Sequence, residues 1–83
     1  MNVRLVISGR GYDTATDLPD RLTLETDASI DDALTQLTSL VDKLPVSCLL
    51  AVSGIHLGTL GNHREHILAD GDEIVLIAPV AGG

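Results

Sequence analysis

The spacing of apolar residues changes near the middle of the chain, and this change constrains the fold more than any other feature of the sequence. Between residues 30 and 44 the apolar side chains recur every three or four residues, the spacing that lines one face of a helix. They are Ile30, Ala33, Leu34, Leu37, Val41 and Leu44. Ser29 is suited to cap this helix, and Pro45 to end it. The sequence therefore predicts one helix between Ser29 and Pro45, with segments of a different period on both sides.

The flanking segments carry the signals of strands. Apolar residues alternate with polar ones over residues 2–8 and 21–26, and residues 48–52 and 73–78 are short apolar runs. Residues 56–69 are irregular, and we expect a short edge strand there. A helix on one face of a mixed sheet of four or five strands is the simplest arrangement. If the first and last strands are parallel neighbours, residues 1–78 form a β-grasp domain of the α+β class.

Composition and charge limit the kind of protein this is. The 83 residues allow one domain, and the core must be aliphatic because the chain is 45% hydrophobic but only 1% aromatic. A net charge of −7 disfavours nucleic acid as a partner. No apolar run is long enough to span a membrane, and no signal peptide opens the chain, so we expect a soluble cytoplasmic protein. Cys48 has no disulfide partner, and we expect it to be a small buried hydrophobe.

The last five residues form a separate tail in this interpretation. Pro79 offers no N–H and ends sheet pairing, so residues 79–83 can project as an extended arm about 17 Å long, at ~3.4 Å per residue. By chance a chain ends in two glycines about once in 200 cases, given average glycine usage. Without Cβ atoms, Gly82 and Gly83 can enter a narrow passage. We therefore expect the tail to have a function.

The end of the chain resembles the MoaD/ThiS family of ubiquitin-like sulfur carriers. The resemblance lies in Leu68-Ala69-Asp70-Gly71-Asp72-Glu73-Ile74 and in Ala78-Pro79-Val80-Ala81-Gly82-Gly83. The Pro-Val-Ala-Gly-Gly ending is most similar to MoaD, the small subunit of molybdopterin synthase. Chains of that branch commonly carry Phe where this one has Leu76 and Ile77, and Pro in place of Ala78.

The resemblance implies a role for the tail and a set of partners. The Gly83 carboxylate is adenylated and then converted to a thiocarboxylate, which donates sulfur in molybdenum cofactor biosynthesis. A MoeB-like E1-type enzyme uses ATP for this activation, and a MoaE-like large subunit catalyses the transfer. The chain itself is then not an enzyme and binds no cofactor of its own.

Partner binding is expected to use the last strand as well as the tail. Val75 and Ile77 alternate with Ile74, Leu76 and Ala78, so one set faces the helix and the other lies on the opposite sheet face. We expect an apolar partner surface there. It is formed by Val75 and Ile77 with Leu57 and Leu60 as neighbours, and continues into Pro79, Val80 and Ala81.

Three alternatives remain open at this point. A ThiS-like carrier serves thiazole synthesis in place of molybdopterin synthesis. A ubiquitin-like modifier is joined through Gly83 to a lysine of a substrate protein. A plain β-grasp interaction module has an inert tail. By contrast, His63-x-x-His66 lacks a third and a fourth ligand, so we predict no metal site and expect surface histidines.

Overall fold

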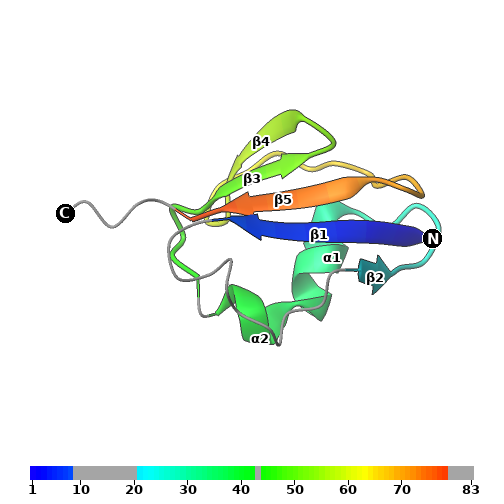
Figure 1. The fold of residues 1–83 in the computed structure, drawn as a ribbon, viewed down its shortest axis with the longest axis horizontal. Helices are drawn as coiled ribbons and strands as arrows, with labels where there is room; N and C mark the ends of the chain where they lie inside the picture. The colour runs from blue at the N-terminus through cyan, green and yellow to red at the C-terminus, as the bar shows by residue number, and fades with distance from the viewer. Residues whose placement is uncertain (9–20, 43, 79–83) are drawn as a thin grey trace.

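The computed structural model describes residues 1–8, 21–42 and 44–78, and Figure 1 shows the arrangement of its elements. The elements, in chain order, are β1 (Asn2–Ser8), β2 (Arg21–Thr23), α1 (Ile30–Gln36), α2 (Thr38–Val41), β3 (Leu49–Val52), β4 (Ile55–Thr59) and β5 (Glu73–Ile77). The strands lie where the sequence predicted them, although β2 is shorter than expected. The irregular segment contains the expected edge strand, β4.

The five strands form one sheet in the order β2-β1-β5-β3-β4. The first and last strands, β1 and β5, are parallel neighbours, with Leu5 opposite Ile74. The other pairs are antiparallel. A parallel pair needs a long crossover connection, which the helices and the β3–β4 hairpin provide between β1 and β5. This is the α+β β-grasp arrangement that the sequence predicted.

The helix begins as predicted but is divided in two. The Ser29 Oγ accepts a hydrogen bond from the Asp32 backbone N–H (3.2 Å), and an Asp32 carboxylate oxygen accepts one from the Ser29 N–H (2.9 Å). This capping box fixes the start of α1. The expectation of one continuous helix is wrong, because α1 ends at Gln36, with Leu37 as its C-cap, and α2 begins at Thr38. On either side of Leu37, the hydroxyls of Thr35 and Thr38 donate to backbone carbonyls, a bonding pattern that bends helices.

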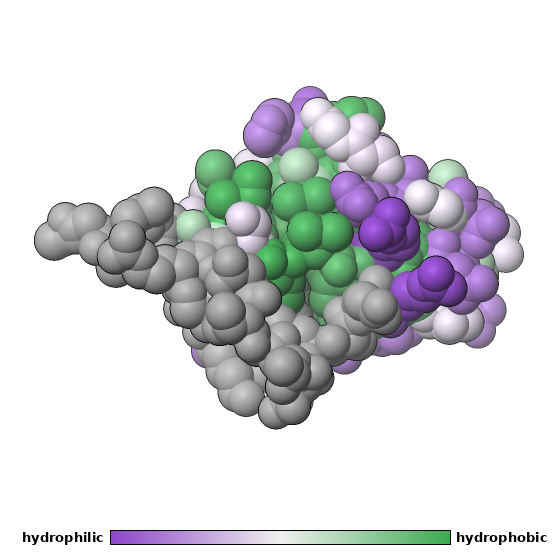
Figure 2. All heavy atoms as spheres, in the orientation of Figure 1, coloured by the Kyte–Doolittle hydropathy of each residue, from purple (hydrophilic) through white to green (hydrophobic). Residues whose placement is uncertain are grey.

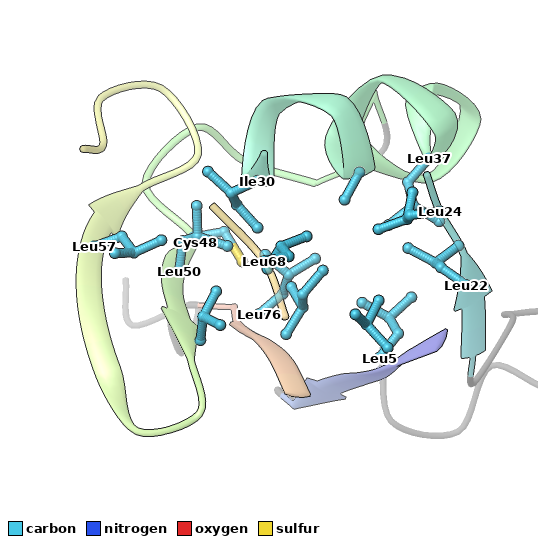
Figure 3. Close-up of a cluster of buried hydrophobic side chains, with 14 of the residues drawn as sticks. Leu5, Leu22, Leu24, Ile30, Leu37, Cys48, Leu50, Leu57, Leu68 and Leu76 are labelled. Carbon is cyan, nitrogen blue, oxygen red and sulfur yellow. The ribbon is translucent and has the colours of Figure 1, made fainter. Parts of the chain in front are cut away.

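The core lies between the helices and one face of the sheet. Figure 3 shows its side chains converging from the helices, from the strands and from the segment around Leu68. Ile30, Leu50, Ile74 and Leu76 are fully buried. Cys48 is also fully buried, as expected, and burial raises the pKa of its thiol. The core is aliphatic throughout the described residues, and neither of the two helices within them, α1 and α2, covers the opposite face of the sheet.

Candidate functional site

The tail begins at a fixed point of the sheet. β5 ends at Ile77, and the backbone N–H of Ala78 still donates to the carbonyl of Ser8 on β1 (2.8 Å). Ala78 is itself buried in the core. The predicted tail residues lie outside the described part of the chain; they are Pro79, Val80, Ala81, Gly82 and Gly83. The structure thus defines the place from which the tail starts and the surface beside it.

That surface is the face of the sheet opposite the helices, here called the open face. Val75 and Ile77 lie on it, while Ile74 and Leu76 face the core, as the alternation of β5 predicted. The register places Val6 and Ala51 on either side of Val75.

Neighbouring strands extend the apolar surface further. Leu49 lies opposite Ile77 and is 44% exposed. Figure 2 shows apolar atoms gathered on this face over β1, β5 and β3. We call this the open-face patch; its residues are Val6, Leu49, Ala51, Val75 and Ile77.

Two residues predicted for this surface lie elsewhere. Leu57 is only 5% exposed and points into the core, as Figure 3 shows. The pairing of β3 and β4 shifts register between Leu50 and Ala51, and such a bulge reverses the face on which the following side chains lie. Leu60 is half-buried and packs against the core as well. The prediction that these two leucines flank Val75 and Ile77 is therefore wrong.

The register also identifies open-face residues that the sequence analysis did not select. From the sequence, Leu49 and Ala51 belong to a strand predicted to be buried, and Val6 belongs to a strand predicted to be half-buried. They lie in the patch because β1 and β3 are the strands on either side of β5. Because the order of strands in a sheet depends on contacts far apart in sequence, alternation along a single strand does not reveal these neighbours.

A charged row borders the open-face patch. Arg4 lies opposite Glu73 on one side and opposite Arg21 on the other. The Arg4 Nη1 is 3.8 Å from a Glu73 carboxylate oxygen, and both side chains are exposed. A pair at that distance in solvent contributes little to stability. This row separates the apolar patch from the end of the sheet where β1 begins.

The histidines do not form a metal site in the described residues. No group of three or more His, Cys, Asp or Glu side chains close enough to hold a metal ion occurs there. His63 is not a surface histidine, since its side chain is only 11% exposed. Its Nε2 lies 2.7 Å from the Asp31 carboxylate and its Nδ1 lies 2.8 Å from the Thr59 carbonyl. This residue joins the segment after β4 to the first turn of α1.

Burial of the His63 ring opposes its protonation, but the hydrogen bonds to Asp31 and Thr59 and the charge of Asp31 outweigh that effect. Together they raise the pKa of His63 above its usual value. Both ring nitrogens face acceptor oxygens, which suits the protonated ring because it donates from both nitrogens. The contact is therefore a structural link rather than a ligand site.

No helix within residues 1–8, 21–42 and 44–78 is long and apolar enough to cross a membrane.

Comparison with known proteins gives one match. The sequence pattern of the ThiS family matches residues 12–83, which includes the tail and everything described after β1. Searches of curated proteins and of solved structures find no match. ThiS-family proteins are small, non-catalytic sulfur carriers that work with E1-like and synthase partners, and their fold is the β-grasp fold seen here. The match covers most of the sequence, so the chain belongs to the ThiS family.

Proposed function

We propose that this chain carries sulfur as a thiocarboxylate on Gly83 and donates it in molybdopterin synthesis, as the small subunit of the synthase. One observation carries the proposal: the family match runs through the Pro79–Gly83 ending, which follows directly from the end of β5 beside the open-face patch. A reactive end next to an apolar docking surface suits a protein that must deliver its terminus into another enzyme.

The chemistry needs an electrophilic acyl carbon at Gly83. The terminal carboxylate attacks the α-phosphate of ATP on the activating enzyme, which forms an acyl-adenylate and releases pyrophosphate. A sulfur nucleophile then attacks the acyl carbon and expels AMP. Hydrosulfide gives the thiocarboxylate directly, whereas a persulfide gives an acyl disulfide, whose S–S bond a thiol must then reduce to leave the thiocarboxylate. Every reactive group other than the Gly83 carboxylate belongs to a partner. The chain therefore needs no nucleotide site or catalytic residues of its own in this mechanism.

The body of the domain has two tasks in this mechanism. It holds the start of the tail, because β5 lies between β1 and β3 in the sheet and Ala78 is still bonded to Ser8. It also presents the open-face patch at the end of β5, since Ile77 lies opposite Leu49 there. Rigid placement of Ala78, the residue before the tail, relative to the docking surface reduces the entropy lost on binding a partner.

The choice of pathway rests on the tail sequence. Pro79-Val80-Ala81-Gly82-Gly83 resembles the molybdopterin branch, and this is the branch we propose. Leu76, Ile77 and Ala78 stand where that branch commonly has Phe and Pro, and these differences favour thiazole synthesis as the second candidate. Both candidates use the same Gly83 chemistry and differ in the enzyme that accepts the sulfur.

Intact-mass measurement tests the chemistry. After co-expression with the E1-like enzyme and sulfur source of the same host, we expect a species in which one carboxylate oxygen is replaced by sulfur. A chain extended beyond Gly83 by a tag is the matched control and should stay unmodified. If the native chain also stays unmodified in a lysate that makes the cofactor, the proposal is wrong. If lysine conjugates are the main product, the chain is a protein modifier instead.

Complementation tests the pathway. We expect the chain to restore a molybdoenzyme activity in a host that lacks its own molybdopterin synthase small subunit, and not to rescue a thiazole-requiring strain. Deletion of Gly83 should abolish rescue while changing stability little, because a terminal residue makes few contacts. Rescue of the thiazole strain alone would assign the chain to the second candidate.

A further inference from the structure

Two arginines face each other across the β1–β2 pair. Arg4 and Arg21 are directly opposite in the antiparallel register, so their side chains leave the sheet on the same face, and both residues are exposed. Like charges at directly opposed positions destabilise a sheet. Among the described residues, the one ion pair that either arginine makes is the 3.8 Å contact between Arg4 and Glu73. An additional anion at this position would offset the repulsion.

The local charge is opposite to that of the whole chain. The protein carries twelve acidic and five basic residues, for a net charge of −7. In the five strands, however, Glu73 is the only acidic residue. The other acids of the described segments lie outside the strands; they are Glu25, Asp27, Asp31, Asp32, Asp42, Glu65, Asp70 and Asp72. Among the described residues, the strands of the open face therefore carry two arginines and one acidic residue, on a protein whose net charge is negative.

A shallow groove lies between the arginines and the turn before β5. Its volume is about 200 Å³, and it is lined by Asn2, Val3, Arg4, Arg21, Asp70 and Gly71. Asp70 brings a negative charge to the groove, but one of its carboxylate oxygens already accepts a 2.7 Å hydrogen bond from the Asn2 backbone N–H. Within the lining the two arginines exceed this one acid. Glu73 lies outside the lining and, among the described residues, pairs with Arg4 alone, so the Arg21 side of the groove favours an anionic group.

We propose that Arg4 and Arg21 bind an acidic side chain of the protein that docks on the open-face patch. This inference rests on the proposed function, because it identifies the kind of surface that the partner must present. Arg4 and Val6 occupy the same face of β1, so a partner that covers the patch extends over the arginines too. Arginine pairs well with a carboxylate because its planar fork makes two parallel hydrogen bonds. The occupant is thus an Asp or Glu of the partner.

Substitution of the pair tests this assignment. The full chain is compared with Arg4→Gln, Arg21→Gln and the double variant for binding to its purified E1-like enzyme and its synthase large subunit. We expect the double variant to bind at least one of them roughly tenfold more weakly, with a slower association rate and a weaker dependence on salt. Arg64→Gln is the matched control, since Arg64 is exposed but bonds to the His56 carbonyl at the β4 edge (2.7 Å). Equal affinity and salt dependence for the double variant and the native chain would overturn the proposal.

Further measurements separate this result from other outcomes. The double variant should melt at or above the native temperature, because removal of the opposed charges relieves repulsion. At saturating activating enzyme it should still form the Gly83 thiocarboxylate, so weak docking is distinguishable from failure of the carrier chemistry. If inorganic phosphate protects both arginines from a guanidine-specific reagent while both partners bind the double variant normally, the pair serves a free anion and the proposal is wrong.

Discussion

The two faces of the sheet are made from the same strands but follow different rules. On the covered face, Ile74 and Leu76 are fully buried against the helices. On the open face, their neighbours Val75 and Ile77 are only half-buried, and Leu49 is largely exposed. The covered face holds the fold together, whereas the open face leaves apolar side chains partly exposed, and exposed apolar patches often mark interaction surfaces. The difference in burial between alternate residues of β5 thus separates residues that stabilise the fold from residues that are available to bind a partner.

The largest expected effect is on the covered face. Leu76→Ala removes a fully buried side chain and leaves a cavity, so we expect the free energy of unfolding to fall by about 2–5 kcal/mol. Ile77→Ala, one residue along the same strand, should cost less than about 1 kcal/mol because its side chain is already partly in water. Urea unfolding of both variants measures the difference. Equal losses would show that the open face is a second core.

The next largest effect is on partner binding. Here substitutions on the open face should matter more than substitutions on the covered side. Leu49→Asp and Ile77→Asp place a charge in the open-face patch, and we expect them to weaken binding to the activating enzyme or the large subunit by roughly 10- to 100-fold. Ile67→Asp is the control, because Ile67 is 56% exposed and pairs with Ser29 beside α1, away from this patch. Circular dichroism must show that each variant is folded. A folded Leu49→Asp with native affinity for both partners would remove the patch from the interface.

The sequence was most informative about the covered face. Helical spacing located the buried stripe, Ser29 marked its start, and alternation along β5 assigned Ile74 and Leu76 to the core. These signals are local, because each depends on neighbours within a few residues. The parallel pairing of β1 with β5 was also predicted, from the order of the elements.

Features that depend on distant contacts were not visible in the sequence. The bulge beside Leu50 reversed the face of Leu57. The break at Leu37 is a local feature, since the hydroxyls of Thr35 and Thr38 donate to carbonyls within four residues, but the apolar spacing runs through it unchanged. The opposition of Arg4 and Arg21 depends on the register of two strands joined by a long connection. A shift of one residue would have placed the arginines on different faces. The alternation of β5 alone thus predicted that Val75 and Ile77 lie on the open face. The residues beside them on β1 and β3 could be identified only from the strand order and register of the sheet.

The smallest expected effect concerns a polar contact on the covered side, between His63 and Asp31. The pKa of His63 is raised in the folded protein, so protonation favours the folded state. The contribution is fully present below the unfolded pKa of about 6.5 and is lost as the pH rises through the higher folded value. We expect His63→Gln to cost about 0.5–1 kcal/mol near pH 5 and less near pH 8. His56→Gln, at an exposed position, is the control.

Urea unfolding at both pH values measures this difference, and Asp31→Asn sharpens it. Without the carboxylate, the burial of the ring still lowers the pKa of His63, and of the effects that raise it only the backbone hydrogen bonds to Thr59 and Leu60 remain. The pH dependence attributed to His63 should therefore shrink or change sign in Asp31→Asn. The ring is held between the segment after β4 and the first turn of α1, so its loss should loosen the covered side and leave the open-face patch unchanged. Partner affinity should then match the native chain at each pH. A parallel loss of affinity in His63→Gln would mean that the two faces are coupled through the sheet, and that stability and docking are not as separable as the contrast along β5 indicates.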